Sequence, residues 1–163
     1  MLVSAQIHVN AVNCIVINWI YMDSLQYDCR QKAYKLYIDG DEDGAIAVCI
    51  AKNCEKYMEC QRLSGWIFYN ISLYDMAINR FKMAASKGDA ESYFGIGSAH
   101  YALGEYKMAM DLFYQAAGYG YGRAFHWIGG MYRDGIGVPV NYNKTIYFFD
   151  WVRLLITRLC KED

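Results

Sequence analysis

Residues 90–121, AESYFGIGSAHYALGEYKMAMDLFYQAAGYGY, carry a pattern that recurs every 32 residues along this chain. A glycine in the first half of the stretch and an Ala–Phe–Ala set in the second half both return at that interval. Small, large and small residues at i, i+4 and i+7 lie on one face of a helix, with alanines where another helix approaches closely. The matched positions are Gly65, Gly97 and Gly129, together with Ala77, Phe81, Ala84 and their counterparts Ala109, Phe113, Ala116.

Each 32-residue unit is predicted to form two antiparallel helices, the first holding the glycine and the second holding the Ala–Phe–Ala face. One unit cannot bury its apolar face alone, whereas stacked units bury a continuous core. We therefore predict an all-α, right-handed α-solenoid of antiparallel helix pairs. The predicted repeat domain covers residues 26–163, with four units at about 26–57, 58–89, 90–121 and 122–157.

The last unit carries a further motif. Ala124 is followed by Ile128-Gly129, by Tyr132 and by the run 135–139, GIGVP. This pattern resembles the Sel1-like repeat family, which shows Ala, Leu-Gly, Tyr and Gly-x-Gly-Val-Pro; isoleucine stands here for the leucine. The unit at 90–121 lacks the Gly-x-Gly-Val-Pro insertion and looks more like a tetratricopeptide repeat. The resemblance implies an adaptor that binds a protein or peptide, not a catalyst.

In the family's pattern the first helix of each repeat lines a concave surface. Its inward positions hold many Tyr, Trp and Arg residues, which dominate binding hot spots because they bury a large rigid area and keep a polar group. The alternative is that a flanking helix covers these aromatic side chains and makes them core. The predicted partner-binding residues are Arg30, Tyr34, Tyr37, Arg62, Trp66, Tyr69, Phe94, Tyr101, Arg123, His126 and Arg133.

Composition narrows the possible functions. The chain has 163 residues and a net charge of −1, which argues against nucleic-acid binding because such proteins show a strongly basic face. With 55% apolar residues it is not a disordered tail. We predict a non-catalytic interaction module without a cofactor or metal; the alternative is an immunity protein that neutralises a cognate toxin. An enzyme is a remote alternative, since Glu59, Glu91, Asp134 and His126 are spread over three units.

The cysteines predict no metal site. Six cysteines are present, but none forms a CxxC pair and none has a nearby histidine partner, so zinc is not expected. We expect reduced, mostly packed thiols in a cytoplasmic protein. The run 39–44, DGDEDG, matches the opening of an EF-hand loop, yet the twelfth position is Ile50 rather than the required glutamate. A solvated turn between two helices is the favoured interpretation.

The two ends of the chain are unusual. Residues 1–22 contain no charged side chain, but polar residues interrupt them, so we expect no membrane span. Residues 1–25 are predicted to form either a terminal strand or cap, or a stretch outside the native reading frame, with Met22 as a plausible start. Residues 147–156 are apolar on more than one face. Either the N-terminal segment covers them, or they form a second interface, for example in a homodimer.

Overall fold

The computed structural model describes residues 28–51 and 54–159, with side chains described as far as residue 154. The chain divides into two compact units, Met1–Cys60 (unit 1) and Gln61–Asp163 (unit 2), which we describe separately. All regular secondary structure in the described ranges is helical, so the prediction of an all-α fold is confirmed. None of the helices described is both long and apolar enough to cross a membrane. The alternatives for residues 1–25 fall outside the described ranges.

Unit 1 contains a helix over residues 28–38 and helix α2 (Glu42–Ile50). Asp41 caps α2, since its carboxylate accepts a hydrogen bond from the Gly44 N–H at 2.9 Å. The acidic run therefore forms a turn and a helix start, as its sequence predicts. Within residues 28–51 and 54–60, the buried apolar residues are all small, and they are Cys29, Ala33, Ala45, Cys49, Cys54 and Cys60.

Two of these cysteines are joined. Cys29 and Cys54 form a disulfide, with their Cα atoms 5.8 Å apart. The expectation of reduced thiols is therefore wrong for this pair. The sequence gives no indication of the pairing, because the two cysteines are at a sequence separation of 25 and helix α2 lies between them. Cys49 and Cys60 are buried thiols, in agreement with the expectation. Cys14 and Cys160 fall outside the part of the chain that the structure describes.

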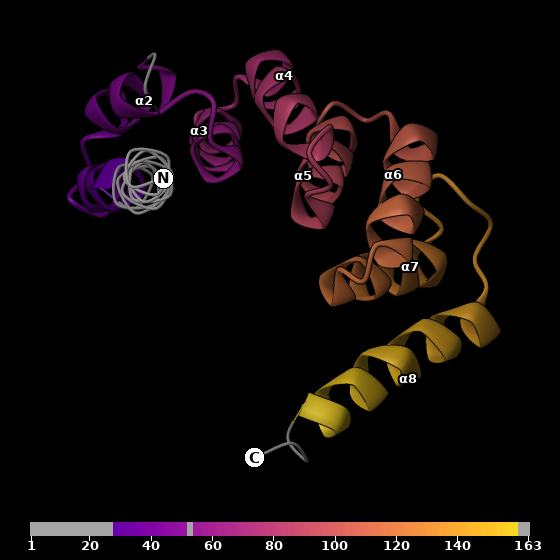
Figure 1. The fold of residues 1–163 in the computed structure, drawn as a ribbon. Helices are drawn as coiled ribbons and strands as arrows, with labels where there is room; N and C mark the ends of the chain where they lie inside the picture. Colours follow the sequence, from indigo (N-terminus) through magenta and orange to yellow (C-terminus); the bar gives the residue numbers. More distant parts are fainter. Residues whose placement is uncertain (1–27, 52–53, 160–163) are drawn as a thin grey trace, which may run out of the picture. The chain divides into compact units, whose positions relative to one another are not determined.

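Unit 2 is a series of helices joined by short turns, except for the longer loop between the helices α7 and α8 (Figure 1). Helix α4 contacts α5, α5 contacts α6, α6 contacts α7, and α7 contacts α8. Helix α3 begins in unit 1 with residues 58–60 and continues in unit 2. The bounds are α3 (Met58–Asn70), α4 (Tyr74–Ala85), α5 (Ala90–Ala102), α6 (Tyr106–Gly118), α7 (Gly122–Asp134) and α8 (Tyr142–Leu159).

The repeated glycines and phenylalanines are packing partners. A Cβ added to Gly97 would lie 2.8 Å from the ring of Phe113, and one added to Gly65 would lie 2.7 Å from the ring of Phe81. Both rings are fully buried. The missing glycine side chain thus leaves the space that the aromatic ring fills. This contact explains why the two residues recur together at the same interval.

The loop after α7 explains the longer fourth unit. Gly135 ends α7 in the left-handed conformation, at φ 70°. Gly137, also at positive φ, lies against the first turn of α6, where an added Cβ would come within 2.6 Å of the Tyr106 Cβ. Both positions have a positive φ angle, which favours glycine, and Gly137 has no room for a side chain. The backbone of this loop therefore requires the Gly-x-Gly spacing.

Two glycines on neighbouring helices should respond oppositely to alanine. Gly97→Ala is expected to destabilise the protein by about 1–3 kcal/mol, because the new methyl group overlaps the Phe113 ring and approaches the Ala109 carbonyl oxygen to 3.3 Å. Gly130→Ala is expected to stabilise α7 by roughly 0.5–1 kcal/mol, since no atom lies within 4 Å of its added Cβ. Urea unfolding followed by circular dichroism measures both changes. Equal effects of the two variants would contradict the proposed Gly–Phe contact.

Helix α8 has one buried and one exposed apolar side. Phe148 is 8% exposed and contacts rings of α6 and α7, whereas Ile146 is 60% and Leu154 53% exposed. Tyr147 and Trp151 are also exposed. The sequence predicted apolar character on more than one face of this segment, and the described side chains show it. A homodimer through this exposed side stays a prediction.

Candidate functional site

A polar cluster joins α3 to the start of α5. The Arg62 guanidinium donates a hydrogen bond to the Asp89 carboxylate at 2.8 Å and lies 3.4 Å from Glu91. The Trp66 indole N–H donates to the second Glu91 oxygen at 3.0 Å. We call these four residues the Arg62–Glu91 cluster. Asp89 is only 7% exposed and also caps α5 by accepting from the Ser92 N–H at 3.0 Å. The two carboxylates of the cluster therefore hold the Arg62 and Trp66 side chains of α3 in place.

The start of α7 adds two residues to the same region. Burial raises the pKa of the Tyr121 hydroxyl, and the nearby Glu91 carboxylate raises it further. A hydrogen bond with Arg123 and the charge of Arg62 act in the opposite direction. The Arg123 guanidinium also lies 6.0 Å from the centre of the Phe94 ring, within cation–π range. Side chains of α3, α5 and α7 are thus electrostatically coupled along one side of unit 2.

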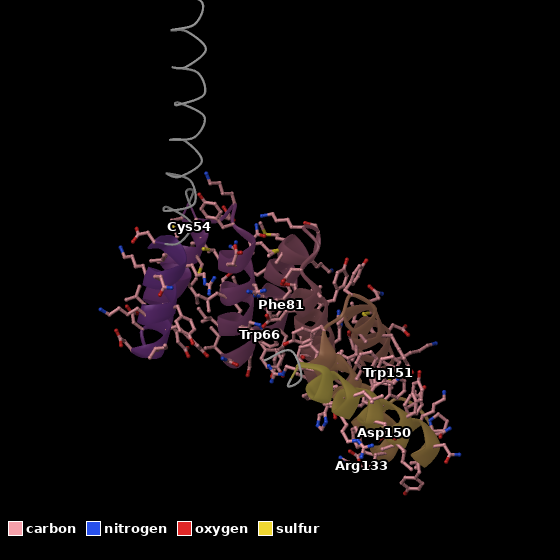
Figure 2. The ribbon with its side chains drawn as sticks, turned by 60° about the horizontal axis from the view of Figure 1, so that its bottom comes forward. Cys54, Trp66, Phe81, Arg133, Asp150 and Trp151 are labelled. Atoms are coloured by element: carbon pink, nitrogen blue, oxygen red, sulfur yellow. A yellow bond between two sulfur atoms is a disulfide. The ribbon has the colours of Figure 1, made fainter. Side chains whose placement is uncertain are left out.

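We call the Arg62–Glu91 cluster together with Tyr121 and Arg123 the polar layer. Aromatic rings pack next to it. The Trp66 ring lies 4.9 Å from the ring of Phe81, and both residues are labelled in Figure 2. The Phe94 ring lies 6.2 Å from that of Trp66. Trp127 then contacts both Phe94 and Tyr101, at 6.1 and 5.3 Å. Phe94 itself is only 3% exposed. The prediction that Phe94 contacts a partner is therefore wrong, because rings from α3, α6 and α7 surround it and make it core.

A pocket of about 180 Å³ opens beside this aromatic row. We call it the α5–α7 pocket, since α5, α7 and the loop after α7 form its walls. Gly130 leaves open space there, because a Cβ added to it would meet no atom within 4 Å. The pocket combines apolar walls with one charged pair. Its lining residues are Tyr101, His126, Trp127, Gly130, Met131, Arg133, Asp134 and Ile136.

The charged pair at this pocket is internally neutralised. Arg133 donates two hydrogen bonds to Asp134, at 2.7 and 2.8 Å. These bonds raise the pKa of Arg133 and lower the pKa of Asp134. Both side chains are exposed, so water screens the pair. The pair gives the pocket edge both donor and acceptor groups with little net charge.

The structure brings together most of the predicted site residues of unit 2. Arg62, Trp66 and Arg123 belong to the polar layer, while Tyr101, His126 and Arg133 line the pocket. Tyr69 lies 5.6 Å from Trp66 and is half-buried, and burial raises its pKa. The other three predicted residues lie in unit 1, on the helix over 28–38. These are Arg30 and Tyr34, which are exposed, and Tyr37, which is half-buried.

Three contributing residues were not among the predicted ones: Asp89, Glu91 and Tyr121. Glu91 occupies an inward position of the repeat, but it was considered only for acid–base chemistry. Asp89 and Tyr121 precede the first helical residues of α5 and α7, outside the positions that the repeat pattern marks as inward. An aspartate immediately before a predicted helix is a helix-start pattern that could have identified Asp89 as the cap of α5.

The geometry of this repeat stack is shared with solved proteins. A crystal structure of MamA matches with a TM-score of 0.66 at 18% identity, covering 86% of this chain and 81% of MamA. A Sel1 repeat protein from Oxalobacter formigenes matches with a TM-score of 0.58 at 22% identity, covering 74% of this chain and 53% of that one. This chain has the Sel1- and tetratricopeptide-type repeat fold. MamA residues 41–end from Desulfovibrio magneticus RS-1 give a TM-score of 0.64 at 17% identity, covering 82% of this chain and 76% of that one.

The sequence similarity to known proteins is weaker than the structural similarity. No protein-family model and no curated protein matches the sequence. The repeat fold therefore rests on three-dimensional similarity and on the 32-residue pattern. Repeat folds of this type present extended concave surfaces to their ligands. Among the described residues, no group of three or more His, Cys, Asp or Glu side chains could hold a metal ion.

Proposed function

We propose that unit 2 is a non-catalytic module that binds a partner protein through the Arg62–Glu91 cluster and the α5–α7 pocket. The α5–α7 pocket carries this proposal, because three residues predicted from the repeat pattern line it together. Its size suits one inserted side chain of a partner. Tyr, Trp and Arg are the residue types that contribute most to binding at such surfaces.

The acidic groups of this surface support binding rather than catalysis. Asp89 already accepts hydrogen bonds from Arg62 and from the start of α5. Glu91 accepts from Trp66, and Asp134 accepts from Arg133. A general acid or base must lie within hydrogen-bond reach of the proton that it transfers, and its pKa must suit that transfer. These carboxylates instead hold the arginine and tryptophan side chains in place, which reduces the entropy that binding must remove.

Filling the pocket should weaken partner binding without loss of fold. Gly130→Leu places a side chain in open space on a helix, and leucine favours helix over glycine. We expect the partner's Kd to rise at least about tenfold, roughly 1.4 kcal/mol. A tagged wild-type chain captures the partner from the host that makes the protein. Calorimetry with purified partner then measures the Kd.

Gly118→Leu is the matched control. Gly118 ends α6, has equally open surroundings and does not line the α5–α7 pocket. Its Kd should stay within about twofold of wild type. Retained affinity in a folded Gly130→Leu variant would exclude the pocket from the interface. A toxin as the captured partner would assign the immunity role, and any other partner would assign the adaptor role.

A further inference from the structure

Unit 1 has lost the packing contact that defines the other repeats. The position of Phe81 and Phe113 is occupied 32 residues earlier by Cys49, and that of Gly65 by Ala33. Both unit 1 residues are fully buried. A buried phenylalanine contributes far more apolar area than a cysteine. The first helix pair therefore lacks its large central side chain.

No large apolar side chain in the described part of unit 1 is fully buried. The six buried apolar residues there are all alanine or cysteine. Leu36, Ile46 and Val48 are half-buried, and Tyr34 and Ile38 are 52% and 64% exposed. A single helix pair with so small a core is not expected to be stable by itself, and a disulfide is one common way to stabilise such a short segment.

The Cys29–Cys54 disulfide can compensate for the missing large side chain in the core of unit 1. Cys29 is in the helix over 28–38, and Cys54 is in the turn that follows α2. The bond thus closes a loop, with a sequence separation of 25, that contains both helices. Closing a loop of that length shifts the folding equilibrium by roughly several hundred-fold toward the folded form.

We propose that unit 1 is a redox-dependent fold, whose helix pair stays folded while the Cys29–Cys54 disulfide is intact and opens when it is reduced. Unit 2 has its own core of buried aromatic side chains and stays folded in both states. The proposal does not depend on the binding surface of unit 2. It places the folded form of unit 1 in an oxidising compartment, since cytosolic thiols are kept reduced.

The redox step is thiol–disulfide exchange with a small dithiol. A thiolate of the dithiol attacks one Sγ atom, the protein S–S bond breaks, and a mixed disulfide forms. The second thiol of the reagent then displaces the protein sulfur, which leaves two protein thiols and an oxidised, disulfide-form reagent. A disulfide oxidant such as oxidised glutathione reverses the step. Because Cys29 and Cys54 are 4% and 3% exposed, exchange requires transient opening of the helix pair.

Disulfide mapping and hydrogen exchange on the full chain test the proposal. Protein folded with oxidised glutathione is digested without reduction, and mass spectrometry should identify a peptide linking Cys29 to Cys54. Dithiothreitol should then speed amide exchange in residues 28–50 by about 100-fold or more. Exchange in α5, α6 and α7 should change by less than about twofold.

Two variants separate the disulfide from the core. Cys29→Ala/Cys54→Ala should exchange like the reduced wild type and should not respond to dithiothreitol. Cys49→Ala alters the same core but leaves the bond, so its response to dithiothreitol should remain. Three results would each overturn the proposal: a different pairing such as Cys49–Cys60, full protection of residues 28–50 after reduction, or equal loss of protection in both units.

Discussion

Phe113→Ala is expected to lower the free energy of unfolding by about 3–5 kcal/mol. The Phe113 ring is fully buried and lies against Gly97 of α5. Its centre is 5.3 Å from that of Phe94 and 5.6 Å from that of Trp127. Truncation therefore leaves a cavity shared by three helices. Urea unfolding followed by tryptophan fluorescence measures the loss, because Trp127 reports directly on this core.

Met108→Ala provides the control on the same helix. Met108 is 51% exposed, so its truncation should change stability by less than about 0.5 kcal/mol. A loss under about 1 kcal/mol for Phe113→Ala would show that the surrounding helices can collapse onto the vacated space. That outcome would contradict the interpretation of the repeated phenylalanine as the residue that packs the two helices of a pair against each other.

Asp89→Ala is expected to cost about 2–3 kcal/mol of stability, since it removes a helix cap and one side of a partly buried ion pair. Asp89 accepts from the Ser92 backbone N–H and from Arg62, and it also contacts the Ser92 hydroxyl. Arg62 would retain only Glu91, at 3.4 Å. The same urea titration measures the loss, here with circular dichroism.

Asp89→Asn separates the two contributions. Asparagine caps a helix about as well as aspartate but carries no charge. We expect a loss of about 1 kcal/mol, the part due to the charge-assisted bond with Arg62. An asparagine variant as unstable as the alanine variant would assign the whole effect to the ion pair. An asparagine variant equal to wild type would assign it to the cap.

The repeat fold could be predicted from sequence because its determinants are local. Gly97 and Phe113 meet within one helix pair, so their spacing is visible in the chain. The repeat also predicts which positions face inward, and that assignment stays a prediction. Whether a neighbouring helix covers such a position could not be predicted, and Phe94 shows why: its covering rings come from three other helices. The Cys29–Cys54 bond was missed because it departs from the repeat pattern instead of following it.

The contacts between successive helix pairs differ from one junction to the next. Gly95 and Trp127 occupy equivalent places, 32 residues apart. The ring of Phe81 fits against Gly95, where an added Cβ would come within 2.6 Å, while Phe113 instead meets the indole of Trp127. Substitutions at this repeat position should therefore act differently at the two junctions. A side chain added at Gly95 would meet the Phe81 ring, whereas shortening Trp127 would remove a ring contact of Phe113.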